Sequence, residues 1–140
     1  MITEELILIK NNLDSALSRI DELIRIYNIE NPTAGMSQQQ KMDYILDGIC
    51  NYGGILRRGL RKEGTRAYRV LFFRRIACYI LSKYADFTEH EIADELDLTH
   101  GSVNNHKKKM AIWMDEPRFA PKNLHITTKN ILIKLGYEKE

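Results

Sequence analysis

The apolar positions of residues 1–30 recur at intervals of seven. They form two lines along the chain: Leu6, Leu13, Ile20 and Tyr27, and Ile2, Ile9, Ala16 and Leu23. Alternating steps of three and four residues are typical of the a and d positions of a heptad repeat. We therefore predict an N-terminal helical arm, coiled-coil-like, over residues 1–36. Its apolar stripe must be buried against a second copy of the chain or against the rest of the same chain, and the regularity of the repeat favours a homodimer.

A break follows the arm in the sequence NPTAGMS, where Pro32 and Gly35 end the first helix and Ser37 can cap the next one. Apolar residues at steps of three and four then predict a helix over residues 38–52, which Gly53 and Gly54 end, and a central helix over 67–84. No stretch alternates in the manner of a strand. The expected fold class is therefore all-α.

The last segment carries one more apolar helical face, made of Ile131, Leu132 and Leu135. Thr127 or Thr128 is expected to cap this short helix, and Gly136 suits its C-terminal end. The predicted organisation is an arm over 1–36, a domain over 37–114, and a C-terminal extension over 115–140.

The most informative stretch runs from Thr88 to Met110 and reads TEHEIADELDLTHGSVNNHKKKM. Thr88 and Glu91 have the spacing of a capping box, in which the Thr88 hydroxyl accepts from one free backbone N–H and the Glu91 side chain reaches back to another. Ile92 and Leu96 lie on the inward face of this first helix. The small Ala93 between them allows a second helix to cross closely, as in a helix-turn-helix.

The second helix of the motif is expected to begin after Thr99, which can cap it. Val103, Met110 and Trp113 give it an inward face. The opposite face carries Gly101 and the polar residues His100, Ser102, Asn104, Asn105 and Lys108. Asparagine pairs bidentately with adenine in the major groove, and a helix N-terminus favours a phosphate. This face therefore predicts double-stranded DNA as the partner.

Positive charge is concentrated ahead of the motif. From Arg57 to Arg75 there are eight basic residues and a single acid, Glu63, whereas the whole chain has a net charge of only +2. Such a block is typical of a surface that binds a polyanion, although a solvated helix face with a basic loop has the same composition. The first helix of the motif is acidic, which favours the alternative of a helical interaction adaptor whose helix-turn-helix is only a scaffold.

The predicted DNA contacts combine the motif with the basic block. They are Arg66, Arg69, Arg74, Arg75, Thr88, His90, Thr99, His100, Gly101, Ser102, Asn104, Asn105 and Lys108. We expect a nucleoid-associated cytoplasmic protein with no membrane span, no export signal, no metal and no cofactor. The four histidines lack metal-ligand spacing, and no nucleophile has an identifiable base, so neither an enzyme nor a small-molecule substrate is expected. Cys50 and Cys78 are predicted to be buried, reduced thiols.

Three pieces of residues 42–113 together resemble a known family. They are similar to the C-terminal DNA-binding domain of the bacterial replication initiator DnaA, which belongs to the Trp-repressor-like helix-turn-helix group. The three pieces are MDYILDGICNYGGI, RRIACYIL, and TEHEIADEL followed by THGSV. The resemblance implies sequence-specific DNA binding in transcription or replication control, for example of a phage or mobile element. The 140 residues contain no phosphate-binding GxxxxGK[ST] loop, so we do not expect the initiator itself.

The resemblance also implies roles for individual residues. His100 takes the position of the family's histidine, Thr99 that of the preceding acid, and Gly101 and Ser102 those of two base-reading hydroxyl residues. The basic loop before the central helix would lie near the phosphates or the minor groove. This chain has Phe72 where the family has a minor-groove arginine, and Gly101 lacks a hydroxyl. The resemblance therefore does not fix the target sequence.

Overall fold

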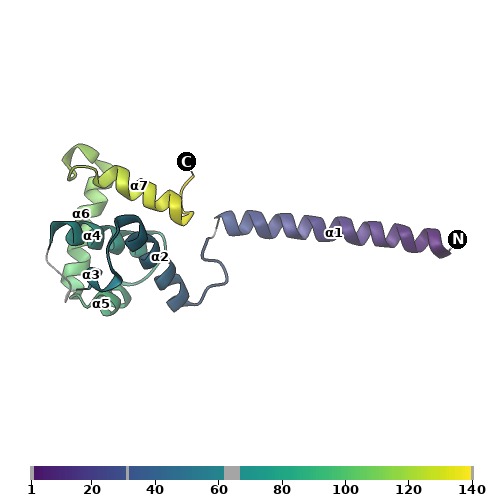
Figure 1. The fold of residues 1–140 in the computed structure, drawn as a ribbon, viewed down its shortest axis with the longest axis horizontal. Coiled ribbons are helices and arrows are strands. Elements are labelled where there is room, and N and C mark those ends of the chain that lie inside the picture. Colours follow the sequence, from purple (N-terminus) through teal and green to yellow (C-terminus); the bar gives the residue numbers. More distant parts are fainter. Residues whose placement is uncertain (1, 31, 62–66, 140) are drawn as a thin grey trace. The chain divides into compact units, whose positions relative to one another are not determined.

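The computed structural model describes residues 2–30, 32–61 and 67–139, in which every regular element is helical (Figure 1). The helices are α1 (Ile2–Glu30), α2 (Gln38–Gly53), α3 (Arg57–Leu60), α4 (Tyr68–Lys83), α5 (Glu89–Leu96), α6 (His100–Asp115), the 3₁₀ turn η1 (Pro117–Phe119) and α7 (Leu124–Leu135). The prediction of an all-α fold is confirmed. The chain divides into two compact units, Met1–Ala34 and Gly35–Glu140.

The first unit is built on the single 29-residue helix α1. Every side chain from Thr3 to Leu23 is exposed, including the large apolar ones of the heptad lines, such as Leu6 at 59%, Leu13 at 60% and Leu23 at 66%. The side chains of Ile2 and Tyr27, which the heptad prediction also used, lie outside the described residues. The stripe that the sequence predicts is thus an exposed apolar face of α1.

The second unit begins at a complete capping box. The Ser37 hydroxyl accepts a hydrogen bond from the Gln40 backbone N–H at 3.1 Å, and the Gln40 side chain accepts one from the Ser37 N–H at 2.9 Å. These bonds satisfy donors that the first turn of α2 leaves free. At the other end Gly54 adopts a left-handed conformation with φ of 65°, as the Gly53-Gly54 pair predicts.

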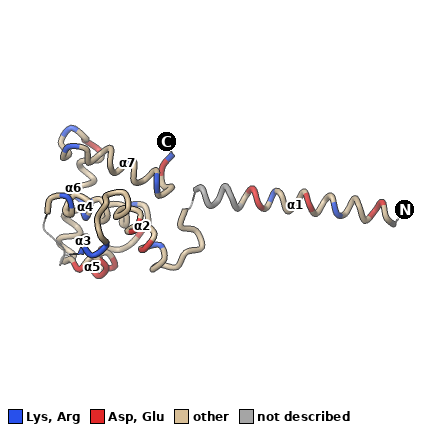
Figure 2. Tube along the Cα trace, viewed as in Figure 1, with Lys and Arg blue, Asp and Glu red and all other residues tan. Residues whose placement is uncertain are grey.

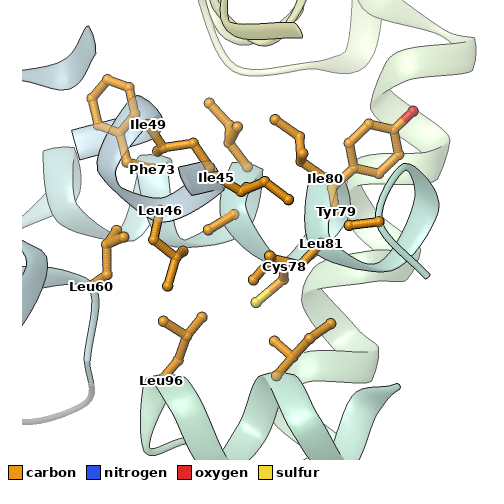
Figure 3. Close-up of a cluster of buried hydrophobic side chains, with 14 of the residues drawn as sticks. Ile45, Leu46, Ile49, Leu60, Phe73, Cys78, Tyr79, Ile80, Leu81 and Leu96 are labelled. Atoms are coloured by element: carbon orange, nitrogen blue, oxygen red, sulfur yellow. The ribbon is translucent and has the colours of Figure 1, made fainter. Parts of the chain in front are cut away.

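The core of the second unit is organised around α4, which is the most buried helix. Ile76, Ala77, Cys78, Ile80 and Leu81 are inaccessible to solvent. Figure 3 shows α2 and α4 contributing most of the labelled side chains, with Leu96 of α5 pointing toward them. Among the residues whose side chains the structure describes, the buried apolar ones lie between Met42 and Leu135. The unit therefore closes its own core, which anchors the helices that carry the candidate site.

Helix α7 differs from its prediction in where it begins and in which residue caps it. It begins at Leu124, one turn before the expected caps, and Thr128 is buried with its hydroxyl donating to the Leu124 carbonyl at 2.8 Å; the prediction that Thr127 or Thr128 caps it is wrong. Residues 115–140 also belong to the same compact unit as residues 37–114. A Cβ on Gly48 would lie 2.5 Å from Leu135 Cδ2, so α2 and α7 approach closely where glycine has no side chain.

Candidate nucleic-acid interface

Helix α5 begins at the capping box that the sequence predicts. The Thr88 hydroxyl accepts from the Glu91 N–H at 3.2 Å, and the Glu91 carboxylate accepts from the Thr88 N–H at 3.1 Å. These hydrogen bonds hold the pKa of Glu91 below its usual range, because they favour the ionised carboxylate. Ile92, Ala93 and Leu96 are buried. The predicted inward face of α5 is therefore present, with the small Ala93 between Ile92 and Leu96.

A tight turn connects α5 to α6. Asp97 adopts a left-handed conformation with φ of 52°, and the N–H of Leu98 donates to the Ala93 carbonyl at 2.9 Å. The Thr99 hydroxyl then accepts from the Ser102 N–H at 3.1 Å and caps α6. Both caps of the predicted helix-turn-helix are thus present, and they fix where the second helix starts.

Helix α6 has one buried and one open side. Val103 and Met110 are fully buried, and Trp113 is half-buried against the core. The open side, called here the α6 edge, consists of Thr99, His100, Gly101, Ser102, Asn104, Asn105 and Lys108, of which Ser102 and Asn104 are half-buried and the others exposed. A Cβ on Gly101 would meet nothing within 4 Å. Internal packing therefore does not require this glycine, and the backbone at this point is open to a ligand.

Two predicted contact residues, His90 and His100, meet at the start of the two helices. His90 Nδ1 lies 3.1 Å from His100 Nε2, with the rings nearly perpendicular at 81°. The other ring nitrogen of His90 lies 3.3 Å from an Asp94 carboxylate oxygen. A hydrogen bond between the rings ties the first turn of α6 to α5 and orients His100 at the α6 edge.

Helix α5 is marked by acidic residues (red in Figure 2), and each of them has a partner. Glu89 accepts from Lys107 Nζ at 3.1 Å, and Glu95 accepts from Arg57 at 3.0 Å. Asp94 faces His90, and Glu91 belongs to the capping box. Pairing with cations offsets part of the charge that would repel a phosphate. The acidity of α5 consequently weighs less against DNA binding than the sequence alone suggests.

Two members of the basic block are engaged inside the domain. Arg57 binds Asp43, Asp47 and Glu95, which links α2 to α5. Arg74 donates to the carbonyls of Leu60 at 2.7 Å, Arg61 at 2.8 Å and Gly59 at 3.3 Å, which satisfies the end of α3. A direct contact of Arg74 with DNA stays a prediction, and it would require the guanidinium to leave these carbonyls.

The remaining predicted arginines occupy different settings. Arg69 is exposed, donates to the Gly53 carbonyl and lies over the Phe73 ring, 5.6 Å from its centroid. Arg75 is half-buried and stacks over Trp113 at 5.3 Å. Arg66 lies outside the described residues. Arg58 and Arg61 are also exposed, so the open cations of the block lie on or beside α3 as well as at the start of α4.

His106 is a buried polar residue of α6 that the sequence did not single out. It is 7% exposed, and its Nδ1 has no hydrogen-bond partner among the described residues. Burial, together with the positive charges of Arg75, Arg74 and Lys109, lowers its pKa from 6.5 to about 4. The imidazole is therefore neutral at neutral pH, and it belongs to the packing of α6 rather than to the α6 edge.

The lowered pKa of His106 predicts acid sensitivity. Unfolding returns the pKa to its ordinary value, so between about pH 6.5 and pH 4 the unfolded chain binds more protons than the folded one, and stability falls as pH falls through this window. Between pH 7 and pH 4, the free energy of unfolding of His106→Leu should therefore fall by on the order of 2 kcal/mol less than that of the parent, after allowance for solvent screening. Urea unfolding of both proteins at pH 7 and pH 4 measures it. Equal losses in the two proteins would contradict the assignment.

The capping box of α5 predicts a second, independent stability effect. Thr88→Ala should lower the free energy of unfolding by about 1 kcal/mol, because an N–H of the first turn loses its acceptor. Thr88→Ser keeps the hydroxyl and is the matched control, expected to stay within a few tenths of a kcal/mol of the parent. Thermal or urea unfolding without DNA measures both. Similar losses for alanine and serine would show that the methyl group, not the cap, matters.

No family model matches this chain, and no curated protein or solved structure matches it significantly. Within the described residues, no helix is long and apolar enough to cross a membrane, and no group of three or more histidine, cysteine or acidic side chains is arranged to hold a metal ion. Cys50 and Cys78 are buried free thiols, as predicted. The geometry of the α6 edge is consequently the main basis for a functional assignment.

Proposed function

We propose that the protein binds double-stranded DNA sequence-specifically and that the α6 edge enters the major groove. The observation that carries the proposal is a doubly capped helix pair whose second helix buries Val103 and Met110 and exposes His100, Gly101 and Asn105. An α-helix fits the major groove, and the N-terminal residues of a recognition helix contact base edges. Asn105 offers an amide for base readout, and Lys108 lies further along for a phosphate.

Three further features support this assignment. In α5, Glu89 and Glu95 are paired with cations, and Glu91 belongs to the capping box. Exposed Arg58, Arg61 and Arg69 provide positive charge outside α6. The sequence resemblance to the DNA-binding domain of the replication initiator implies the same class of ligand. A protein that regulates transcription or replication, without an activity of its own on a substrate, fits these features best.

A salt titration tests the proposal. In a gel shift on mixed genomic DNA fragments, binding should be detectable at low salt and weaken steeply as salt rises, because the cations that contact phosphates release counterions. A triple variant with Arg58, Arg61 and Arg69 changed to glutamine should weaken binding and lower the salt slope. Absence of binding at low salt would reject the proposal.

A second candidate function is that of a helical interaction adaptor, which the exposed apolar face of α1 favours. In that case α1 would hold a protein partner and the helix-turn-helix would serve as a scaffold. The same gel shift separates the two candidates, because salt-dependent DNA binding is expected of the first and not of an adaptor.

A further inference from the structure

The apolar face of α1 is exposed wherever the structure describes its side chains, from Thr3 to Leu23. Its described a positions are Leu6, Leu13 and Ile20, and its described d positions are Ile9, Ala16 and Leu23; all are exposed. A helix of this length gains most of its stability from packing an apolar face, not from intrinsic propensity. The Gly35–Glu140 unit has a complete core of its own, so the occupant of this face is best sought in another molecule.

From this face and its flanking charges we propose that α1 pairs in parallel with α1 of a second copy of the chain, in register, as a two-stranded coiled coil. Glu5 occupies a g position and Lys10 the e position five residues later. In a parallel pair a g residue meets the e residue five positions further along the other helix, so two symmetric Glu5–Lys10 ion pairs flank the seam. In an antiparallel pair g faces g and e faces e, and Glu5 would not meet Lys10.

The composition of α1 argues against a membrane surface as the occupant. Between Ile2 and Glu30 there are six acidic and three basic side chains. Helices that lie on membranes carry Lys and Arg on the polar face, because the headgroups of anionic lipids repel acids. The 29 residues of α1 span about 44 Å at about 1.5 Å per residue, a length that offers a second copy nearly four heptads of contact.

Parallel pairing has a consequence for the whole chain. Both Gly35–Glu140 units would be attached at the same end of the coiled coil, through residues 31–34. The pair would thus present two copies of the α6 edge, one from each chain. This inference goes beyond DNA binding and does not depend on it, because the assays below contain no DNA.

Sedimentation equilibrium of the full chain at micromolar concentration is the first test, and it should give twice the 16.3 kDa chain mass. Leu13→Asp buries a charge at an a position and should raise the dimer dissociation constant by at least about tenfold. Ser18→Asp introduces the same charge at an f position on the opposite face and should leave the constant near that of the parent. A monomeric parent, a larger assembly, or equal effects of the two variants would overturn the proposal.

Orientation is tested with two further sets of variants. Chains carrying Glu5→Lys and chains carrying Lys10→Glu should each self-associate weakly and should form a mixed dimer when combined, since both pairs between positions 5 and 10′ are then opposite in charge. Leu6→Cys should form a disulfide-linked dimer on mild oxidation, because equivalent a positions meet in a parallel pair. The native cysteines are buried and should not compete. Crosslinking of Leu6→Cys only to a Leu23→Cys chain would show an antiparallel pair and overturn the parallel arrangement.

Discussion

Deleting residues 1–30 is expected to weaken binding to a DNA fragment with two adjacent sites by about a hundredfold or more, while binding to a single site stays nearly unchanged. When two binding modules are linked, the second binding event becomes intramolecular, and avidity exceeds the affinity of one module by about 10²–10⁴. The Gly35–Glu140 unit keeps its own core after the deletion. The loss therefore reports the link between two chains and not unfolding.

The control for this deletion is the full-length chain with Leu13→Asp, which keeps every residue of α1 but puts a charge on its apolar face. It should reproduce the selective loss on the paired site, whereas Ser18→Asp should not. Fluorescence anisotropy on fragments with one and two sites measures all four proteins. Equal losses on the one-site and two-site fragments would contradict a role of α1 in linking two chains, because α1 would then contribute to binding at a single site.

Asn105→Ala is expected to cost about 1–3 kcal/mol of binding free energy on the preferred site, or roughly five- to more than a hundredfold in Kd. The side chain is exposed on the α6 edge, and a bidentate amide contact with a base discriminates among sequences. The variant should therefore lose little on unrelated DNA, so that specificity relaxes. Selection of bound sequences from random DNA, with Kd values for the best and a scrambled site, measures this effect.

Arg69→Ala should behave differently, because a contact with a phosphate carries no base information. We expect weaker binding to all sequences alike and a salt slope reduced by about 1. Since Arg69 also donates to the Gly53 carbonyl, unfolding midpoints must be compared first. Asn130→Ala, an exposed asparagine of α7, is the matched control for Asn105. Parallel specificity profiles for the Asn105 and Arg69 variants would contradict the separation of roles.

The parts of the fold that the sequence predicted are those encoded locally. Capping residues act within one turn, so Ser37, Thr88 and Thr99 identify the starts of their helices without knowledge of the rest of the chain. The inward and outward sides of α6 follow from its helical period, with Val103 buried and Asn105 exposed. The positions of the candidate contacts on the α6 edge were therefore predictable, although their ligand stays a proposal.

The parts that the sequence could not supply depend on long-range contacts. Arg57 meets Glu95, which is 38 residues away, and Lys107 meets Glu89 across the turn between α5 and α6. No local sequence pattern marks either ion pair. The sequence alone therefore suggested that the charges of the basic block and of α5 were unpaired, whereas Arg57, Glu89 and Glu95 are paired. The start of α7 was misjudged because two threonines resemble caps, whereas Thr128 is buried in a helix that contacts α2 and α4.

The most direct test of the account is to map the DNA contact on the protein itself. Amide resonances of isotope-labelled protein should be followed as a short duplex of the selected sequence is added at low salt. We expect the largest shifts on Thr99, Gly101 and Asn105, with smaller ones near Arg58 and Arg69. Shifts confined to α7, or an unchanged α6 edge in a saturated complex, would contradict it.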